Sequence, residues 1–199
     1  MKTNRKEMIL QTINDFGVVS VKQLHEILNL GSYRYTCKLI QELEDYLIVE
    51  RTKQKKIYLN KRGKEFIGST TEIIAENDYY FENQIYLFFK KPPTWQKNVE
   101  IQVQSKYEGI EVKGLNVIQH LNITVPAVFQ KGAYLCLVEV DGNRTIQENE
   151  ERINLYRKVL PHLKQEKYML FYFTKTEGRK KRLEEMLEGI VSEVFVLNE

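Results

Sequence analysis

Residues 17–63, GVVSVKQLHEILNLGSYRYTCKLIQELEDYLIVERTKQKKIYLNKRG, hold the pattern that decides the fold of the first part of the chain. Apolar residues recur at helical spacing in two segments of this stretch, and the sequence LGS at residues 30–32 separates the two. Two short β-prone runs follow, over residues 47–51 and 57–59. Two helices, a tight turn and a β-ribbon in this order predict a small helical unit that carries a ribbon at one end.

Polar caps and a glycine mark where these helices begin and end. We expect a helix over residues 5–16, ahead of the two, and a second helix that Ser20 caps. Gln23 lies three positions after Ser20, which is the spacing of a capping box. Gly31 supplies the next turn, where a positive φ is expected, and Ser32 caps the third helix.

The third helix, expected to run to about residue 46, is the candidate for contacting DNA bases. One face carries the residues expected to pack inward: Tyr33, Thr36, Cys37, Ile40, Leu43 and Leu47. The opposite face carries the candidate DNA contacts: Arg34, Tyr35, Lys38 and Gln41. Arginine can bond guanine with two hydrogen bonds, and tyrosine or lysine can reach a phosphate or a thymine methyl group. The alternative interpretation is an ordinary solvated helix face.

The connection between the two β-prone runs is strongly basic. Its candidate DNA contacts are Arg51, Lys53, Gln54, Lys55 and Lys56, and Ser32 adds a candidate contact at the start of the third helix. A basic ribbon tip of this kind lies on the phosphate backbone or in the minor groove. The phrase YLNKRGKEFI at residues 58–67 then opens a short helix. The whole pattern resembles prokaryotic winged helix-turn-helix regulators, a minority of which bind protein instead of DNA.

Charge is distributed unevenly along the chain. Residues 1–68 contain 13 Lys and Arg against 8 Asp and Glu, whereas residues 69–199 contain 17 against 19. The positive charge is therefore concentrated where phosphate attraction needs it. No apolar run is long enough for a membrane helix and no signal core precedes the first helix, so we expect a cytoplasmic protein. Cys37 and Cys136 are expected to be reduced core thiols.

The rest of the chain alternates helices and strands. We expect a linker over residues 69–78 between an N-terminal domain, 1–68, and a second domain, 79–199. The expected helices and strands are α 79–90, β 99–103, β 125–130, β 133–140, α 146–160, β 168–174, α 179–189 and β 191–197. This α-β-β-β-α-β-α-β order predicts an α+β or α/β layered domain with a mixed sheet.

That order is the core layout of the PD-(D/E)xK nuclease-like fold. The phrases VPAVF at 125–129, LVEVD at 137–141 and ERINLY at 151–156 resemble those of the replication-relaxation family, and Glu100 lies where an upstream acid is expected. That family joins a winged helix to a nuclease-like domain and is linked to control of plasmid replication and mobile elements. The resemblance implies such a layout over nearly the whole chain.

The chain departs from the family pattern at two positions. Ala127 takes the place of the central aspartate and Asp141 the place of the lysine. Because metal-dependent hydrolysis needs clustered carboxylates and a lysine, we expect no enzyme activity, no metal and no cofactor. If the domain were active, the candidate residues would be Glu100, Glu139 and Asp141. The favoured interpretation is that Glu139 and Asp141 end an edge strand and bond nearby backbone or Arg144.

Other sites have little support in the sequence. The three histidines, His25, His120 and His162, are dispersed without metal-ligand spacing, and His25 is expected on a polar helix face. Aromatic residues gather in one stretch: Tyr79, Tyr80, Phe81, Tyr86, Phe88 and Phe89. We expect them in the core or in a dimer interface, with a ligand pocket or base stacking as the alternative.

The sequence predicts a DNA-binding regulator that acts as a homodimer on double-stranded DNA, with plasmid or mobile-element replication, transfer or transcription as the process. Two alternatives stay open: a diverged metal-dependent nuclease or nickase, and an adaptor for a replication initiator or relaxase.

Overall fold

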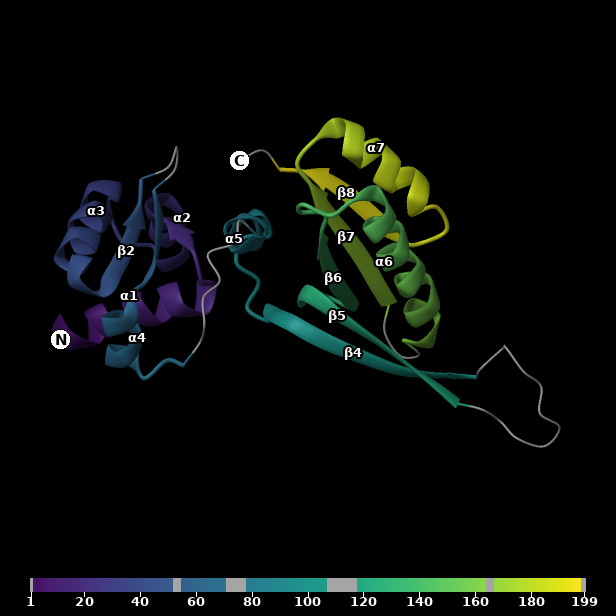
Figure 1. The fold of residues 1–199 in the computed structure, drawn as a ribbon, viewed down its shortest axis with the longest axis horizontal. Helices are drawn as coiled ribbons and strands as arrows, with labels where there is room; N and C mark the ends of the chain where they lie inside the picture. Colours follow the sequence, from purple (N-terminus) through teal and green to yellow (C-terminus); the bar gives the residue numbers. More distant parts are fainter. Residues whose placement is uncertain (1, 52–54, 71–77, 107–117, 164–166, 198–199) are drawn as a thin grey trace. The chain divides into compact units, whose positions relative to one another are not determined.

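The computed structural model of the chain describes residues 2–51, 55–70, 78–106, 118–163 and 167–197. The chain divides into two compact units, Met1–Lys91 and Pro92–Glu199. Both units combine helices with strands (Figure 1). The expected mixed α and β class is therefore confirmed. No helix among the described residues is both long and apolar enough to cross a membrane.

The first unit surrounds a small antiparallel sheet with helices. Its elements are α1 (Lys2–Phe16), β1 (Val19–Ser20), α2 (Val21–Leu28), α3 (Tyr33–Glu42), a 3₁₀ turn (Glu44–Tyr46), β2 (Leu47–Glu50), β3 (Lys56–Leu59), α4 (Lys61–Ile67) and α5 (Asp78–Phe88). The strands lie in the order β1-β3-β2, so Ile57 of β3 pairs with both Val19 and Val49. The buried side chains of Ile9, Ile13 and Ile57 belong to one apolar core.

The helix caps of this unit are as expected. Ser20 Oγ accepts from the amide of Gln23 at 3.1 Å, and the Gln23 side chain accepts from the amide of Ser20 at 3.0 Å, which completes the capping box. Ser32 Oγ accepts from the amide of Tyr35 at 3.2 Å, and Gly31 has a φ of 53°. The third helix ends at Glu42, earlier than expected, because the chain tightens into the 3₁₀ turn.

Helix α5 belongs to the first unit, so the expected boundary at residues 69–78 lies too early. The buried Asn83 side chain donates to the carbonyl groups of Phe16 at 3.1 Å and Val18 at 2.8 Å. Gln23 Nε2 donates to the carbonyl of Tyr80 at 2.9 Å. These side chains satisfy buried backbone groups far away in the sequence, which local periodicity does not reveal. The division follows Lys91 instead.

The second unit is a five-stranded mixed sheet with helices on one face. Its elements are β4 (Gln96–Lys106), β5 (Ile118–Lys131), β6 (Tyr134–Val140), α6 (Ile146–Val159), a 3₁₀ turn (Leu160–His162), β7 (Lys167–Thr174), α7 (Glu177–Met186) and β8 (Ser192–Val196). The strand order is β4-β5-β6-β7-β8, antiparallel up to β6 and parallel from β6 to β8. The expected β-β-β-α-β-α-β order and mixed sheet are confirmed.

The α6 and α7 helices cover the same face of this sheet (Figure 1). Leu137 of β6 and Tyr172 of β7 share a core with Tyr156 of α6 and Leu183 of α7. Because β6 and β7 are parallel, they end at the same edge of the sheet, and α6 and α7 both begin there. That edge holds the polar residues described below. Strand β6 is central in the sheet, not an edge strand as expected.

Among the glycines of the first unit, Gly63 in α4 lies closest to another backbone segment. A Cβ atom at this position would overlap the carbonyl oxygen of Tyr46. Asn60 also holds the start of α4 against the 3₁₀ turn. Its backbone amide donates to the Tyr46 carbonyl and its side chain donates to the Asp45 carbonyl, each at 3.0 Å. The glycine after the β-ribbon is thus needed for packing α4 against the 3₁₀ turn.

We predict that Gly63→Ala destabilises the first unit by about 1–3 kcal/mol, because the backbone must shift to admit the methyl group. A glycine-to-alanine change in a helix normally stabilises by about 0.5–1 kcal/mol. Gly178→Ala in α7 is the matched control, since a Cβ there meets nothing within 4 Å. Hydrogen exchange of the amides in each unit measures both effects. Equal protection in the two variants would contradict the prediction.

Candidate functional site

The exposed face of α3 is the first candidate site. Arg34, Lys38 and Gln41 are exposed on it, as expected. Two residues that were expected to pack inward are exposed as well: Tyr33, at 52%, and Cys37. Leu39 takes an inward position instead. The face is therefore wider than predicted and includes an aromatic ring and a thiol.

Thr36 and His25 connect α3 to α2. The fully buried Thr36 Oγ1 lies 3.1 Å from His25 Nδ1 and 3.4 Å from the carbonyl oxygen of Ser32. The His25 ring also packs edge-on against Tyr33, with 6.2 Å between ring centroids. His25 was expected on a polar helix face, but it joins α2 to α3. Sequence spacing within one helix carries no signal for this contact.

Two of the candidate DNA contacts on α3 have partners within the unit. The Tyr35 hydroxyl accepts from Arg5 NH1 of α1 at 2.6 Å, and the Arg5 guanidinium lies 6.0 Å from the Tyr35 ring centroid. Lys38 Nζ lies 3.9 Å from a Glu42 carboxylate oxygen, and both side chains are mostly exposed. An exposed pair of this kind is weak and is easily exchanged for a phosphate.

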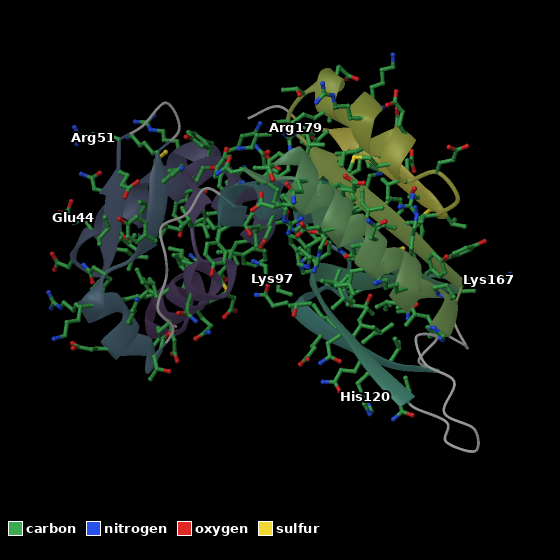
Figure 2. All side chains as sticks on the ribbon, turned by 45° about the vertical axis from the view of Figure 1, so that its right-hand side comes forward. Glu44, Arg51, Lys97, His120, Lys167 and Arg179 are labelled. Atoms are coloured by element: carbon green, nitrogen blue, oxygen red, sulfur yellow. The ribbon has the colours of Figure 1, made fainter. Side chains whose placement is uncertain are left out.

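The ribbon between β2 and β3 contributes the remaining basic residues. Arg51 and Lys55 are exposed and Lys56 is half-buried, while the expected contacts Lys53 and Gln54 lie outside the described residues. Arg51 begins the connection between the two strands (Figure 2). The Tyr58 hydroxyl donates to Glu50 Oε1 at 2.7 Å and so ties the two strands together below the tip.

A shallow hollow of about 470 Å³ opens beside the turn between α2 and α3. His25, Asn29 and Leu87 are among the residues that line it. Lys91 reaches the end of α2, where its Nζ donates to the carbonyl of Glu26 at 3.0 Å and to Asn29 Oδ1 at 3.2 Å. This lysine therefore satisfies helix-terminal oxygen atoms and neutralises the negative end of the α2 dipole.

The second candidate site is the sheet edge where β6 ends. Glu139 is fully buried there and is bound on both carboxylate oxygens. Its Oε1 accepts from Arg144 at 2.7 Å, and its Oε2 accepts from Arg152 Nε at 2.7 Å and from the Tyr156 hydroxyl at 2.8 Å. Arg152 also donates to the carbonyl of Thr124 on β5.

Asp141 lies two residues further on and is equally well bound. Arg179 of α7 forms a two-pronged ion pair with it, and Thr174 Oγ1 donates to its Oδ2 at 2.7 Å. Asn149 Nδ2 donates to its Oδ1 at 2.5 Å, and Asn149 Oδ1 accepts from the Tyr172 hydroxyl at 2.7 Å. The network joins β6, β7, α6 and α7.

Burial, followed by the charge of Glu139, raises the pKa of the phenols of Tyr156 and Tyr172. Both hydroxyl groups therefore stay protonated and donate hydrogen bonds near neutral pH. Each carboxylate then meets arginine and neutral donors in a water-poor site. Such pairing compensates the cost of burying the charge. The favoured expectation that Arg144 binds this region agrees with the geometry, but Arg152 and Arg179 were not foreseen.

The three candidate catalytic acids do not come together. Glu100 is exposed on β4, where it accepts from Gln102 at 3.1 Å, and β5 lies between β4 and β6. Ala127 is buried on β5 and pairs with Val138. Within the described ranges, no group of three His, Cys, Asp or Glu side chains could hold a metal ion. Arginine side chains surround Glu139 and Asp141 instead.

Comparisons with known proteins give little further information. No family model and no curated protein matches the chain. It is similar to a solved structure described as the crystal structure of protein VC1899 from Vibrio cholerae, with 14% identity and a TM-score of 0.37. The match covers 96% of this chain and 48% of that one, so the chain spans about half of that protein's length. This likeness carries no argument about fold or function, and the resemblance to the replication-relaxation family stays a prediction.

We predict that Glu139→Ala destabilises the second unit by about 3–5 kcal/mol, because it leaves Arg144 and Arg152 without their carboxylate in a buried site. Urea unfolding followed by the fluorescence of Trp95, the one tryptophan of the chain, measures the change. Glu150→Ala, at an exposed position of the same helix as Arg152, is the control and should change stability by less than about 0.5 kcal/mol. Similar small losses of stability in both variants would refute a stabilising role for the ion pairs of Glu139 with Arg144 and Arg152.

Proposed function

We propose that the first unit is a winged helix-turn-helix that binds double-stranded DNA, and that the protein is a DNA-binding regulator. The observation that carries this proposal is the exposed face of α3, where Arg34, Lys38 and Gln41 lie side by side on a helix capped by Ser32. Arginine and glutamine are suited to hydrogen bonding with base edges in the major groove.

The order of elements supports the same proposal. Helices α1, α2 and α3 are followed by the β2–β3 ribbon, and β1 completes a three-stranded sheet with it. In a winged helix, α3 would enter the major groove while the ribbon tip contacts phosphates. The exposed Arg51 and Lys55 are suited to the second role, and the first 68 residues carry the net positive charge that attracts DNA.

We propose further that the second unit is a nuclease-like scaffold without catalytic function. The contacts that hold Glu139 and Asp141 support this, because each of their four carboxylate oxygens already accepts two hydrogen bonds and a metal ion would have to displace them. The same contacts argue against the alternative of a diverged nuclease. The second unit would then position the first or bind a partner protein.

The proposed regulator would act as a homodimer. A single winged helix contacts only a few base pairs, so two copies on an inverted repeat supply the missing affinity and specificity. Control of plasmid or mobile-element replication, transfer or transcription is the process that the sequence resemblance suggests. An adaptor role toward a replication initiator or relaxase is compatible with the same architecture.

We predict that Arg34→Ala combined with Lys38→Ala removes the preference for the cognate site, at a cost of about 1–3 kcal/mol for each lost base contact. The measurement is fluorescence anisotropy with a site selected by the wild-type protein and with an unrelated duplex. Lys61→Ala, at a lysine of the same unit whose side chain is 92% exposed on α4, is the control. A wild-type protein without affinity for DNA at low salt would refute the proposed function.

We predict a different effect for the ribbon. Replacing Arg51 and Lys55 by alanine should weaken binding to all DNA sequences alike, because phosphate contacts carry no sequence information. The slope of log K against log [NaCl] should become shallower by about 0.9 for each lost contact. If these changes instead altered which sequence is preferred, the ribbon would contact bases and the assigned role would be wrong.

A further inference from the structure

Helix α7 of the second unit (Glu177–Met186) carries four consecutive basic residues near its start. Arg179, Lys180, Lys181 and Arg182 lie in its N-terminal half, and Glu184 and Glu185 follow in its C-terminal half. The second unit as a whole is balanced, with 15 Lys and Arg against 15 Asp and Glu over residues 92–199. The basic run is therefore a local concentration of charge and does not reflect the composition of the unit.

Apart from Glu177 in its first turn, α7 carries its charges in the order opposite to the one that stabilises a helix. Acidic groups are favourable near the N-terminus and basic groups near the C-terminus, because of the helix dipole. The neighbouring α6 follows this rule, with Glu148 in its first turn and Arg157 and Lys158 in its last. In α7, the last turn carries no basic residue and the basic residues gather in the first half. Helix stability therefore does not explain why they are there.

Internal ion pairing accounts for some of these charges but not for all. Arg179 pairs with Asp141, and Lys180 lies 3.8 Å from Glu184. Lys181 and Arg182 are exposed, and neither forms an ion pair with a described residue. Glu177, in the first turn of α7, offsets one of the four positive charges.

The loop before α6 adds to this positive surface. Arg179 NH2 donates to the carbonyl of Arg144 at 2.6 Å, which holds that loop against the start of α7. The Arg144 side chain is 33% exposed. Glu139 is shared by Arg144 and Arg152, so that cluster also has more cations than acids. We call Arg144 and the four basic residues of α7 the basic patch.

We propose that the basic patch is a second contact surface for the DNA phosphate backbone, so that both units bind the same DNA. Arginine and lysine without base-reading neighbours are suited to phosphates and not to sequence. A second weak contact on one chain raises the overall affinity, because it binds at high effective concentration. This inference rests on the proposed function in taking DNA as the partner.

An anionic membrane is a poorer partner for the basic patch. A membrane-binding surface needs apolar side chains beside the charges. The exposed large apolar residues described in the second unit are Tyr134 and Val191. Tyr134 is the first residue of β6 and Val191 directly precedes β8, so both lie at the sheet edge opposite to the one where α7 begins.

The test is DNA binding by the full-length protein with Lys181→Gln and Arg182→Gln combined. Neither residue belongs to the buried network, so folding is kept. The control combines Lys158→Gln and Lys167→Gln, which remove the same charge at exposed positions near the opposite edge. Figure 2 shows Lys167 and Arg179 well separated on the second unit. Anisotropy with a fluorescent duplex is measured over a series of NaCl concentrations.

We expect the patch variant to bind about tenfold more weakly and its salt slope to fall by about 1.8, since each phosphate contact contributes about 0.9. The control should bind as the wild type does. The thermal midpoint of the patch variant should be unchanged, because both side chains are exposed and lie outside the buried network. A structural role for these residues would lower the midpoint instead, and that result would overturn the proposal.

Equal weakening in the patch variant and the control would also overturn it, because net charge alone would then matter. The proposal would also be overturned if the patch variant bound DNA as the wild type does but no longer bound phosphatidylserine vesicles, because the partner would then be a membrane. The Arg34→Ala, Lys38→Ala protein separates this proposal from the proposed function. If only the patch variant loses DNA binding, the basic patch is a DNA contact and the assignment of α3 is wrong. If only the α3 variant loses DNA binding, the assignment of α3 is right and the basic patch is not a DNA contact.

Discussion

The fold of the second unit depends on how two carboxylates are neutralised inside it. Glu139 and Asp141 end the central strand β6 on its helix-covered face, where an unpaired charge would be prohibitively unstable. Three arginines from three different segments supply the compensation: Arg144, Arg152 and Arg179. The pairing fixes where α6 and α7 begin relative to the sheet.

The two units use polar groups for the same purpose in different ways. In the first unit, single amide, hydroxyl and imidazole side chains connect buried elements: Asn83 binds the α1–β1 connection, and Thr36 with His25 joins α2 to α3. In the second unit, ion pairs between buried carboxylates and arginines connect the strands to the helices.

Most of the secondary structure followed from local signals in the sequence. The capping box at Ser20, the glycine turn at Gly31 and the alternation around Gly132 depend on neighbouring residues only, so the elements there were predicted correctly. Local signals failed where a distant residue decides. Cys37 was expected inside but is exposed, while Thr36 is buried as expected and contacts His25 of α2. The assignment of α5 to the first unit depends on Asn83. The partners of Asp141 lie up to 38 residues away, which no spacing rule identifies.

The two cysteines of the chain differ in chemical accessibility, which has a practical consequence. Cys136 is buried on β6, and burial raises the pKa of its thiol, so it is a poor nucleophile. Cys37 is exposed on α3, one turn after Tyr33 and beside Lys38. A maleimide or iodoacetamide reagent should therefore label Cys37 selectively in the folded protein. The rate of that alkylation reports directly whether a ligand covers this face of α3, without a dye on the ligand itself.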